Sequence, residues 1–184
     1  MTNVRFQSID DYNDVSMKNF YQIGRKQGRS HSELMEVIWK QGRDNSRTPM
    51  QWNASKHAGF STANQTWLGV NPNYPAVNVE KQQQEQDSIL QYYKAMIRVR
   101  ALNQTLIYGS YDLILGDHRQ IYAYTRSLEQ ECITILVNLS EKDAEFSWPA
   151  TMQGKKELLL GNYKMKEYAD ERLFPYEARV YRLV

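Results

Sequence analysis

Residues 121–124 read Ile121-Tyr122-Ala123-Tyr124, and residues 132–137 read Cys132-Ile133-Thr134-Ile135-Leu136-Val137. In both runs side chains alternate with a period of two, and Ala144, Phe146 and Trp148 repeat the pattern. This is the period of a strand with one face in a protein core. Turn-forming residues separate the runs, at Gly116-Asp117, Ser127 to Gln130, Ser140 to Lys142 and Gly161-Asn162. The spacing predicts an antiparallel β-sandwich of five to eight strands over residues 105–184.

The chain before residue 105 is helical in its signals. Residues 8–42 predict two helices, the first capped by Ser8 and the second opened by the capping-box pattern Ser30-His31-Ser32-Glu33. A third helix is predicted over residues 79–102, with one apolar face made by Ile89, Tyr93, Met96 and Ile97. The fold class is therefore α+β, and we place the domain boundary between residues 104 and 105.

A long segment without helical or strand period, residues 43–78, connects the second and third helices. Loops longer than about 12–15 residues are uncommon unless they are functional or disordered. This one is rich in aromatic side chains, which argues against disorder; they are Trp52, Phe60, Trp67 and Tyr74. We predict an ordered loop that its own side chains hold in place.

Composition excludes several classes of protein. The chain of 184 residues carries a net charge of +2 with no basic block, which does not favour nucleic-acid binding. Its three histidines have no carboxylate at ligand spacing, so we predict no metal site, and no motif indicates a cofactor. A single cysteine, Cys132, cannot form an internal disulfide. No leader-like or membrane-length apolar segment is recognised, so the cytoplasm is the expected compartment.

The densest group of polar side chains is Gly42-Arg43-Asp44-Asn45-Ser46-Arg47-Thr48-Pro49-Met50-Gln51-Trp52. An arginine fork grips two oxygens at once, and an indole face suits a sugar ring, so this set is equipped to bind a neutral polyol. On composition alone, a salt bridge at a helix end plus a loop anchor is the stronger interpretation. A second aromatic group allows a sugar-stacking face or cross-strand packing; it comprises Tyr111, Tyr122 and Tyr124.

The segment from Gly42 to Trp52 resembles one found in oligo-1,6-glucosidases and their relatives within the α-amylase superfamily, among them dextran glucosidases, trehalose-6-phosphate hydrolases and sucrose isomerases. Neighbouring segments resemble the same family, and the resemblance runs from residue 1 to residue 184. They are Met1-Thr2-Asn3-Val4, Asp11-Tyr12-Asn13-Asp14, Ala58-Gly59-Phe60-Ser61, Val70-Asn71-Pro72-Asn73-Tyr74 and Pro175-Tyr176-Glu177-Ala178.

The resemblance implies a (β/α)₈ barrel followed by an antiparallel β-domain. Residues 1–104 would be the end of that barrel, with the loop after its eighth strand and its eighth helix, and residues 105–184 would be the β-domain. Loops at the carboxyl ends of barrel strands carry the active site, so residues 1–78 would border it.

The resemblance also implies a function, the release of α-glucose from the non-reducing end of α-1,6-linked oligosaccharides. Retaining glycosidases need two carboxylates about 5–5.5 Å apart. In this family both come from earlier barrel strands, so we name no catalytic residue and leave open whether the chain alone is an enzyme. Arg43 would bind hydroxyls of the terminal glucose, and Arg47 would support the loop or reach the next sugar. Loop support is expected from Asp44, Asn45 and Trp52.

Three other interpretations stay open. The chain could be a non-catalytic carbohydrate-binding or interaction module, a portion of a trehalose-6-phosphate hydrolase, or a subunit that works beside a separate chain carrying the rest of the barrel. Without that barrel, the apolar face of the helix at 79–102 would be exposed, which favours self-association.

Overall fold

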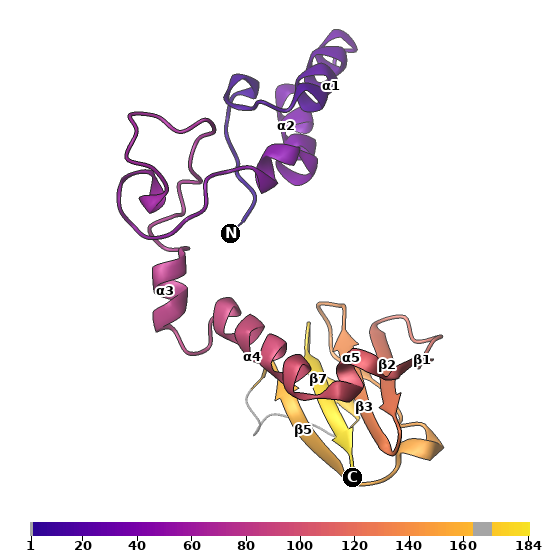
Figure 1. Cartoon of the computed structure of the whole chain (residues 1–184). Coiled ribbons are helices and arrows are strands. Elements are labelled where there is room, and N and C mark those ends of the chain that lie inside the picture. The colour runs from indigo at the N-terminus through magenta and orange to yellow at the C-terminus, as the bar shows by residue number, and fades with distance from the viewer. Residues whose placement is uncertain (1, 164–170) are drawn as a thin grey trace. The chain divides into compact units, whose positions relative to one another are not determined.

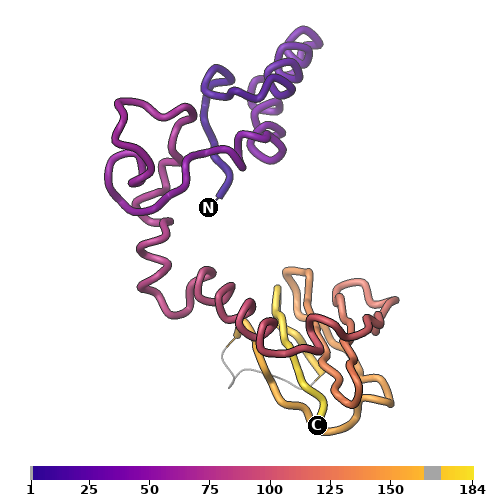
Figure 2. Tube along the Cα trace, viewed as in Figure 1, coloured from indigo at the N-terminus to yellow at the C-terminus, as the bar shows by residue number. Residues whose placement is uncertain are grey.

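A computed structural model describes residues 2–163 and 171–184 (Figures 1 and 2). The chain divides into two compact units, the first ending at Gln91 and the second beginning at Tyr92. The first unit holds three α-helices and the long loop, and the second holds an antiparallel sheet with α5 and most of α4. The α+β class predicted from the sequence is confirmed.

Two helices of similar length open the first unit, α1 (Val15–Lys26) and α2 (His31–Gln41). Gly24 lets them approach closely, because a Cβ at this position would lie 2.4 Å from Cδ2 of Leu34. The predicted capping box of α2 is present: the Ser30 side chain accepts the Glu33 N–H, and the Glu33 carboxylate accepts the Ser30 N–H.

The predicted start of the first helix is wrong. Ser8 caps a single 3₁₀ turn, η1 (Ile9–Asp11), and the α-helix begins only after Asp14, whose carboxylate accepts the N–H groups of Ser16 and Met17. The segment between them instead carries Tyr12 into the core of this unit. That core is completed by Val4, Met35 and Ile38.

The loop over residues 43–78 contains only two 3₁₀ turns, η2 (Arg43–Ser46) and η3 (Lys56–Gly59), and its course can be followed in Figure 2. Side-chain amides replace regular structure as its support. The buried Gln51 donates to Asn73 Oδ1 (2.9 Å) and to the Val77 carbonyl (2.6 Å), and Asn71 donates to the Thr2 carbonyl (3.0 Å). These bonds fit the expectation of an ordered loop held by its own side chains.

The single helix predicted over residues 79–102 is two helices, α3 (Val79–Gln84) and α4 (Ile89–Leu102). Ser88 is the cause of the break. Its hydroxyl donates to the Gln82 carbonyl (2.5 Å) and accepts the Gln91 N–H (3.2 Å), so it closes one helix and caps the next. Residues 80–88 contain no glycine or proline, so no helix-breaking residue marked the break in the sequence.

The second unit continues from α4 through the short helix α5 (Gln104–Tyr108) into seven described strands. They are β1 (Ser110–Ile114), β2 (Ile121–Leu128), β3 (Glu131–Asn138), β4 (Ala144–Glu145), β5 (Lys156–Gly161), β6 (Arg172–Leu173) and β7 (Ala178–Leu183). Five form one antiparallel sheet in the order β1-β2-β3-β7-β5, and β4 pairs with β6 as a small second sheet. A 3₁₀ turn, η4 (Ala150–Met152), precedes β5.

The two faces of the large sheet have different partners. Ile121, Ala123 and Leu136 pack under the small sheet with Phe146 and Trp148. The opposite face is crossed by α4, as Figure 1 shows. An apolar pocket of about 350 Å³ lies between α4 and this face, lined among others by Tyr93, Met96, Ile97, Tyr124, Ile135 and Val180.

Candidate functional site

A sharp corner in the backbone presents Arg43. Helix α2 ends at Gln41 and Gly42 is its C-cap, whose N–H donates to the Ile38 carbonyl at 2.9 Å. A Cβ at Gly42 would lie 2.8 Å from that carbonyl oxygen, so this close approach favours glycine. The chain turns directly into η2, and the Arg43 N–H donates to Asp14 Oδ2 at 2.9 Å. Arg43 therefore sits where the end of one helix meets the start of another.

Two buried aspartates tie the corner together, each binding the other's segment. Asp14 Oδ2 accepts the Arg43 N–H, while Asp44 Oδ2 accepts the N–H groups of Asn13 (2.6 Å) and Asp14 (2.9 Å). Burial raises the pKa of Asp14, but the hydrogen bonds from the Arg43, Met17 and Ser16 amides outweigh it, and the pKa lies below its ordinary value. The carboxylate form is thus the one that the corner stabilises.

The side chain of Arg43 is exposed and forms no hydrogen bond or ion pair with any residue that the structure describes. Arg47 behaves differently, because its Nη1 lies 3.5 Å from Asp44 Oδ1 and its side chain is 41% exposed. Of the two arginines proposed for sugar binding, Arg43 has the freer guanidinium and Arg47 braces the buried aspartate.

The residues expected to support the loop take two positions. Asn45 accepts the Val4 N–H (3.2 Å) and donates to the Trp39 carbonyl (3.0 Å), which joins the amino-terminal segment to the end of α2. Trp52 lies further along, where its N–H donates to the Ala58 carbonyl (2.8 Å). Its backbone thus braces the loop, while 48% of the residue surface is exposed, which leaves its indole accessible to a ligand.

Two residues of this site were not singled out from the sequence. Asp14 appeared only within the family-like segment Asp11-Tyr12-Asn13-Asp14, and its position directly before Val15 is the local signal that it caps α1. Gln51 lies inside the quoted motif, but no local pattern showed that its amide would be buried under the loop.

The aromatic group of the sheet packs across strands. Tyr111 and Tyr122 hydrogen-bond to each other through their hydroxyls (3.0 Å), and both rings contact Tyr124, with centroids 5.3 and 5.5 Å away. Tyr111 and Tyr122 also stay 48% and 43% exposed. The structure thus shows the cross-strand packing of this group. Sugar stacking on the exposed rings of Tyr111 and Tyr122 stays a prediction.

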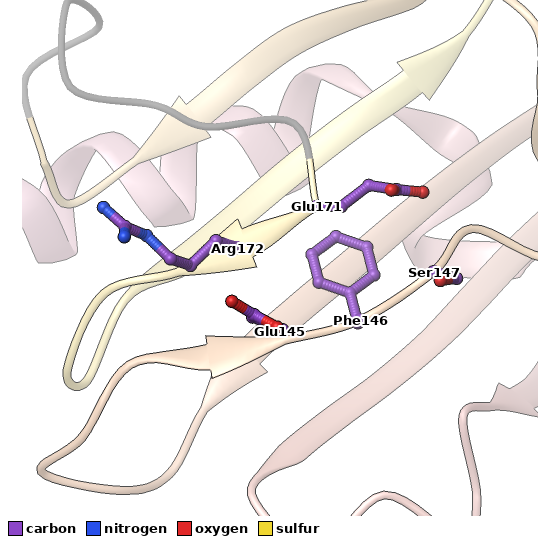
Figure 3. Close-up of a pocket in the computed structure, with 5 residues that line it drawn as sticks. All are labelled: Glu145, Phe146, Ser147, Glu171 and Arg172. Carbon is purple, nitrogen blue, oxygen red and sulfur yellow. The ribbon is translucent and has the colours of Figure 1, made fainter.

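A shallow pocket of about 480 Å³ lies beside β4 and β6. Figure 3 shows Arg172 and Glu171 pointing in opposite directions, with the ring of Phe146 beside them. Arg172 pairs with Asp143 (3.6 Å) and Glu171 accepts the Trp148 N–H (3.5 Å). The polar groups that line this pocket do not converge, so we do not regard the pocket as the functional site.

Within the described ranges, His, Cys, Asp and Glu side chains form no group of three suited to a metal ion. Among the helices described, none combines the length and the apolar character that crossing a bilayer needs.

Comparison with known families matches the two parts of the chain separately. The profile described as "Alpha amylase, catalytic domain" matches residues 1–109. The profile described as "Maltogenic Amylase, C-terminal domain" matches residues 111–180. The corner around Arg43 therefore lies in the catalytic-domain match and the large sheet lies in the other.

Individual proteins extend this similarity over the whole chain. The oligo-1,6-glucosidase of Parageobacillus thermoglucosidasius is 45% identical over 188 residues, covering 100% of this chain and 33% of that protein. The trehalose-6-phosphate hydrolase of Bacillus subtilis (strain 168) is 33% identical, also with 100% and 33% coverage. The chain thus spans about a third of the length of these relatives.

Solved structures show the same fold. The crystal structure of the trehalose-6-phosphate hydrolase of Bacillus licheniformis superposes with a TM-score of 0.92 at 35% identity, covering 100% of this chain and 34% of that chain. The isomaltulose synthase of Klebsiella sp. LX3 gives a TM-score of 0.86 at 33% identity with the same coverage.

Proposed function

The chain belongs to the α-amylase catalytic-domain family, and from that premise we propose that it forms the carboxyl-terminal part of a glycoside hydrolase. The proposed reaction releases α-glucose from the non-reducing end of α-1,6-linked oligosaccharides. Support comes from the relatives named as oligo-1,6-glucosidases, which match along the full length of this chain. We propose the cytoplasm as its compartment.

The observation that carries the proposal is the exposed guanidinium of Arg43 on an otherwise rigid corner. The Arg43 charge acts on the Asp14 carboxylate, but its guanidinium forms no hydrogen bond or ion pair with a described residue, so its five N–H donors are available to a ligand. We propose that Arg43 binds hydroxyls of the terminal glucose and that Arg47 braces the loop through Asp44. Asp44, Asn45 and Trp52 then support the loop.

We propose that the catalytic carboxylates of the enzyme come from the parts of the longer relatives that these 184 residues do not match. The two buried carboxylates beside Arg43 are poor candidates. Asp14 uses both oxygens and Asp44 uses Oδ2 to accept backbone N–H groups, so neither is placed to protonate a leaving group or attack a sugar. The isolated chain is therefore proposed to be inactive.

A hybrid enzyme tests the role of Arg43. In it, this chain replaces the matching third of the Parageobacillus oligo-1,6-glucosidase, and hydrolysis of isomaltose is measured. Arg43→Ala should raise KM about tenfold or more, since a charge-assisted bond to substrate is lost. A KM equal to that of the unchanged hybrid would refute the role.

A trehalose-6-phosphate hydrolase is the second candidate, supported by the TM-scores of such enzymes. Their substrate carries a phosphate, which calls for a cationic site. The discriminating experiment joins this chain to the remaining part of each type of relative and compares isomaltose with trehalose 6-phosphate. Rescue of trehalose-6-phosphate hydrolysis alone would favour the second candidate.

A further part of the proposal concerns the apolar face of α4, which we propose is covered by another protein chain. On α4, Tyr93, Met96 and Ile97 are 56%, 40% and 56% exposed, beside the apolar pocket over the sheet. Such a patch is unusual on a monomer's surface. We propose that a separate barrel chain or a second copy of this chain covers it.

A further inference from the structure

We infer that Asp14 is a positioning residue for Arg43: its carboxylate fixes the backbone from which the sugar-binding guanidinium extends. The inference rests on the proposed role of Arg43 and adds a residue that makes no contact with substrate itself. The inference follows from the reciprocal hydrogen bonds that join the start of α1 to the end of α2.

Fixed points on both sides hold the Arg43 backbone. Its own N–H donates to Asp14 Oδ2 at 2.9 Å. The residue before it is held by the bond from the Gly42 N–H to the Ile38 carbonyl at 2.9 Å. The residue after it, Asp44, is fully buried and accepts two N–H groups of the Asn13–Asp14 segment.

Only a carboxylate serves both ends of this link. Asp14 Oδ1 caps α1 by accepting the Ser16 N–H at 3.0 Å, while Oδ2 accepts the Arg43 N–H. Asparagine has a single side-chain oxygen and serine a single short hydroxyl, so either can cap the helix but cannot also bind Arg43. Asp14 is 3% exposed, so water does not compete for these bonds.

The guanidinium depends on this backbone because no described side chain forms a hydrogen bond or ion pair with it; the Asp14 charge attracts it without a direct contact. A displacement of the Arg43 Cα changes the positions that its guanidinium can reach in unstrained rotamers. A misplacement of about 1 Å at a binding group is enough to lower rates about a hundredfold. Loosening Arg43 should therefore weaken substrate binding even though Arg43 itself is intact.

A double-mutant cycle in the hybrid enzyme tests the inference, with KM and kcat for isomaltose as readout. Asp14→Asn should raise KM about tenfold, with kcat changed less. In an Arg43→Ala background the same Asp14→Asn change should alter KM less than about twofold, because nothing remains to be positioned. A purely structural loss would instead multiply with that of Arg43→Ala.

Matched variants separate positioning from folding. Asp14→Ser keeps a good helix cap and should resemble Asp14→Asn in KM, while Asp10→Asn removes an exposed charge four residues away and should leave KM unchanged. If Arg43→Ala raises KM and Asp14→Asn does not, or if the two effects multiply, the inference fails while the proposed role of Arg43 stands. If Arg43→Ala leaves KM unchanged, the proposed role of Arg43 fails and takes the inference with it.

A second measurement needs no hybrid. In the 184-residue chain, the Arg43 amide proton should exchange slowly with solvent by NMR, and Asp14→Asn should speed its exchange about tenfold. The Gly42 amide, bound to Ile38, serves as the internal reference. Equal Arg43 exchange in both proteins would overturn the inference.

Discussion

Glu177 and Arg179 form a fully buried ion pair in the second unit, with Nε to Oε1 at 2.6 Å and Nη2 to Oε2 at 2.9 Å. Glu177 also accepts the Phe174 N–H at 2.6 Å, and Arg179 donates to the Arg172 carbonyl at 2.5 Å. The pair therefore joins β7 to β6. Since both groups have left water, the attraction between them offsets part of the cost of burying each charge.

Breaking one half of this pair should destabilise the protein strongly. Arg179→Met leaves the buried Glu177 carboxylate without the guanidinium that faces it, and Glu177→Gln removes the negative charge that faces Arg179. For each change we expect a loss of about 3–5 kcal/mol in the free energy of unfolding. Replacing both residues should cost less than the sum of the two losses. Chemical denaturation measures these values.

The control is the exposed pair of Arg172 and Asp143, 3.6 Å apart. Asp143→Asn should cost about 0–1 kcal/mol. Single changes at Glu177 or Arg179 as mild as this control would contradict the assignment of a buried, mutually dependent pair.

The lowered pKa of Asp14 makes stability depend on pH. Its folded pKa lies below the unfolded value of about 3.9, so the stabilisation is complete well above that pH and is lost as pH falls through the folded pKa. Asp14→Asn should therefore be less stable than the wild type at pH 7, and the difference should shrink below about pH 4.

The pKa values of Glu33 and Glu131 are also lowered, so these residues add to the pH dependence of stability. They are present in both proteins, so the difference between wild type and Asp14→Asn isolates the contribution of Asp14. Thermal unfolding between pH 3 and pH 7 supplies the measurement. A difference that stays constant over this range would argue against a stabilised Asp14 carboxylate.

Much of the fold could be predicted because it follows local patterns. The alternation around Ile133 and Ile135 indicated the central strand, and Ser30 with Glu33 marked the start of α2. The break at Ser88 could not be predicted, since it depends on a bond from a hydroxyl to the Gln82 carbonyl that no period reveals.

The candidate site could likewise be predicted only in part. The motif around Arg43 was evident from its composition and its resemblance to a family. The partner of its backbone, Asp14, lies 29 residues earlier in the chain. Such pairings follow from how α1 and α2 pack, so a sequence read segment by segment does not show them.

The exposed apolar face of α4 should make the isolated chain associate. Sedimentation at micromolar concentration should give a mass above the 21.7 kDa of one chain. Ile97→Lys should lower the mass towards that of a monomer, because a charge on the patch must be desolvated on contact. Lys94→Gln, an exposed change on the same helix, is the control and should leave association unchanged. A strictly monomeric wild-type chain would count against a second copy as the partner of this face.

The isolated chain should not hydrolyse p-nitrophenyl α-glucoside. Retention needs one carboxylate as nucleophile and another as acid about 5–5.5 Å away. The best-placed candidates, Asp14 and Asp44, are occupied by N–H groups at the corner that holds Arg43. The hybrid enzyme, assayed beside the chain, should be active, which shows that the assay detects this chemistry. Melting of the chain in the same buffer excludes loss of folding as the reason for inactivity. Turnover by the purified chain at a rate comparable with that of the hybrid would mean that an acid and a nucleophile exist within these 184 residues. The proposal that the catalytic carboxylates lie outside them would then be wrong.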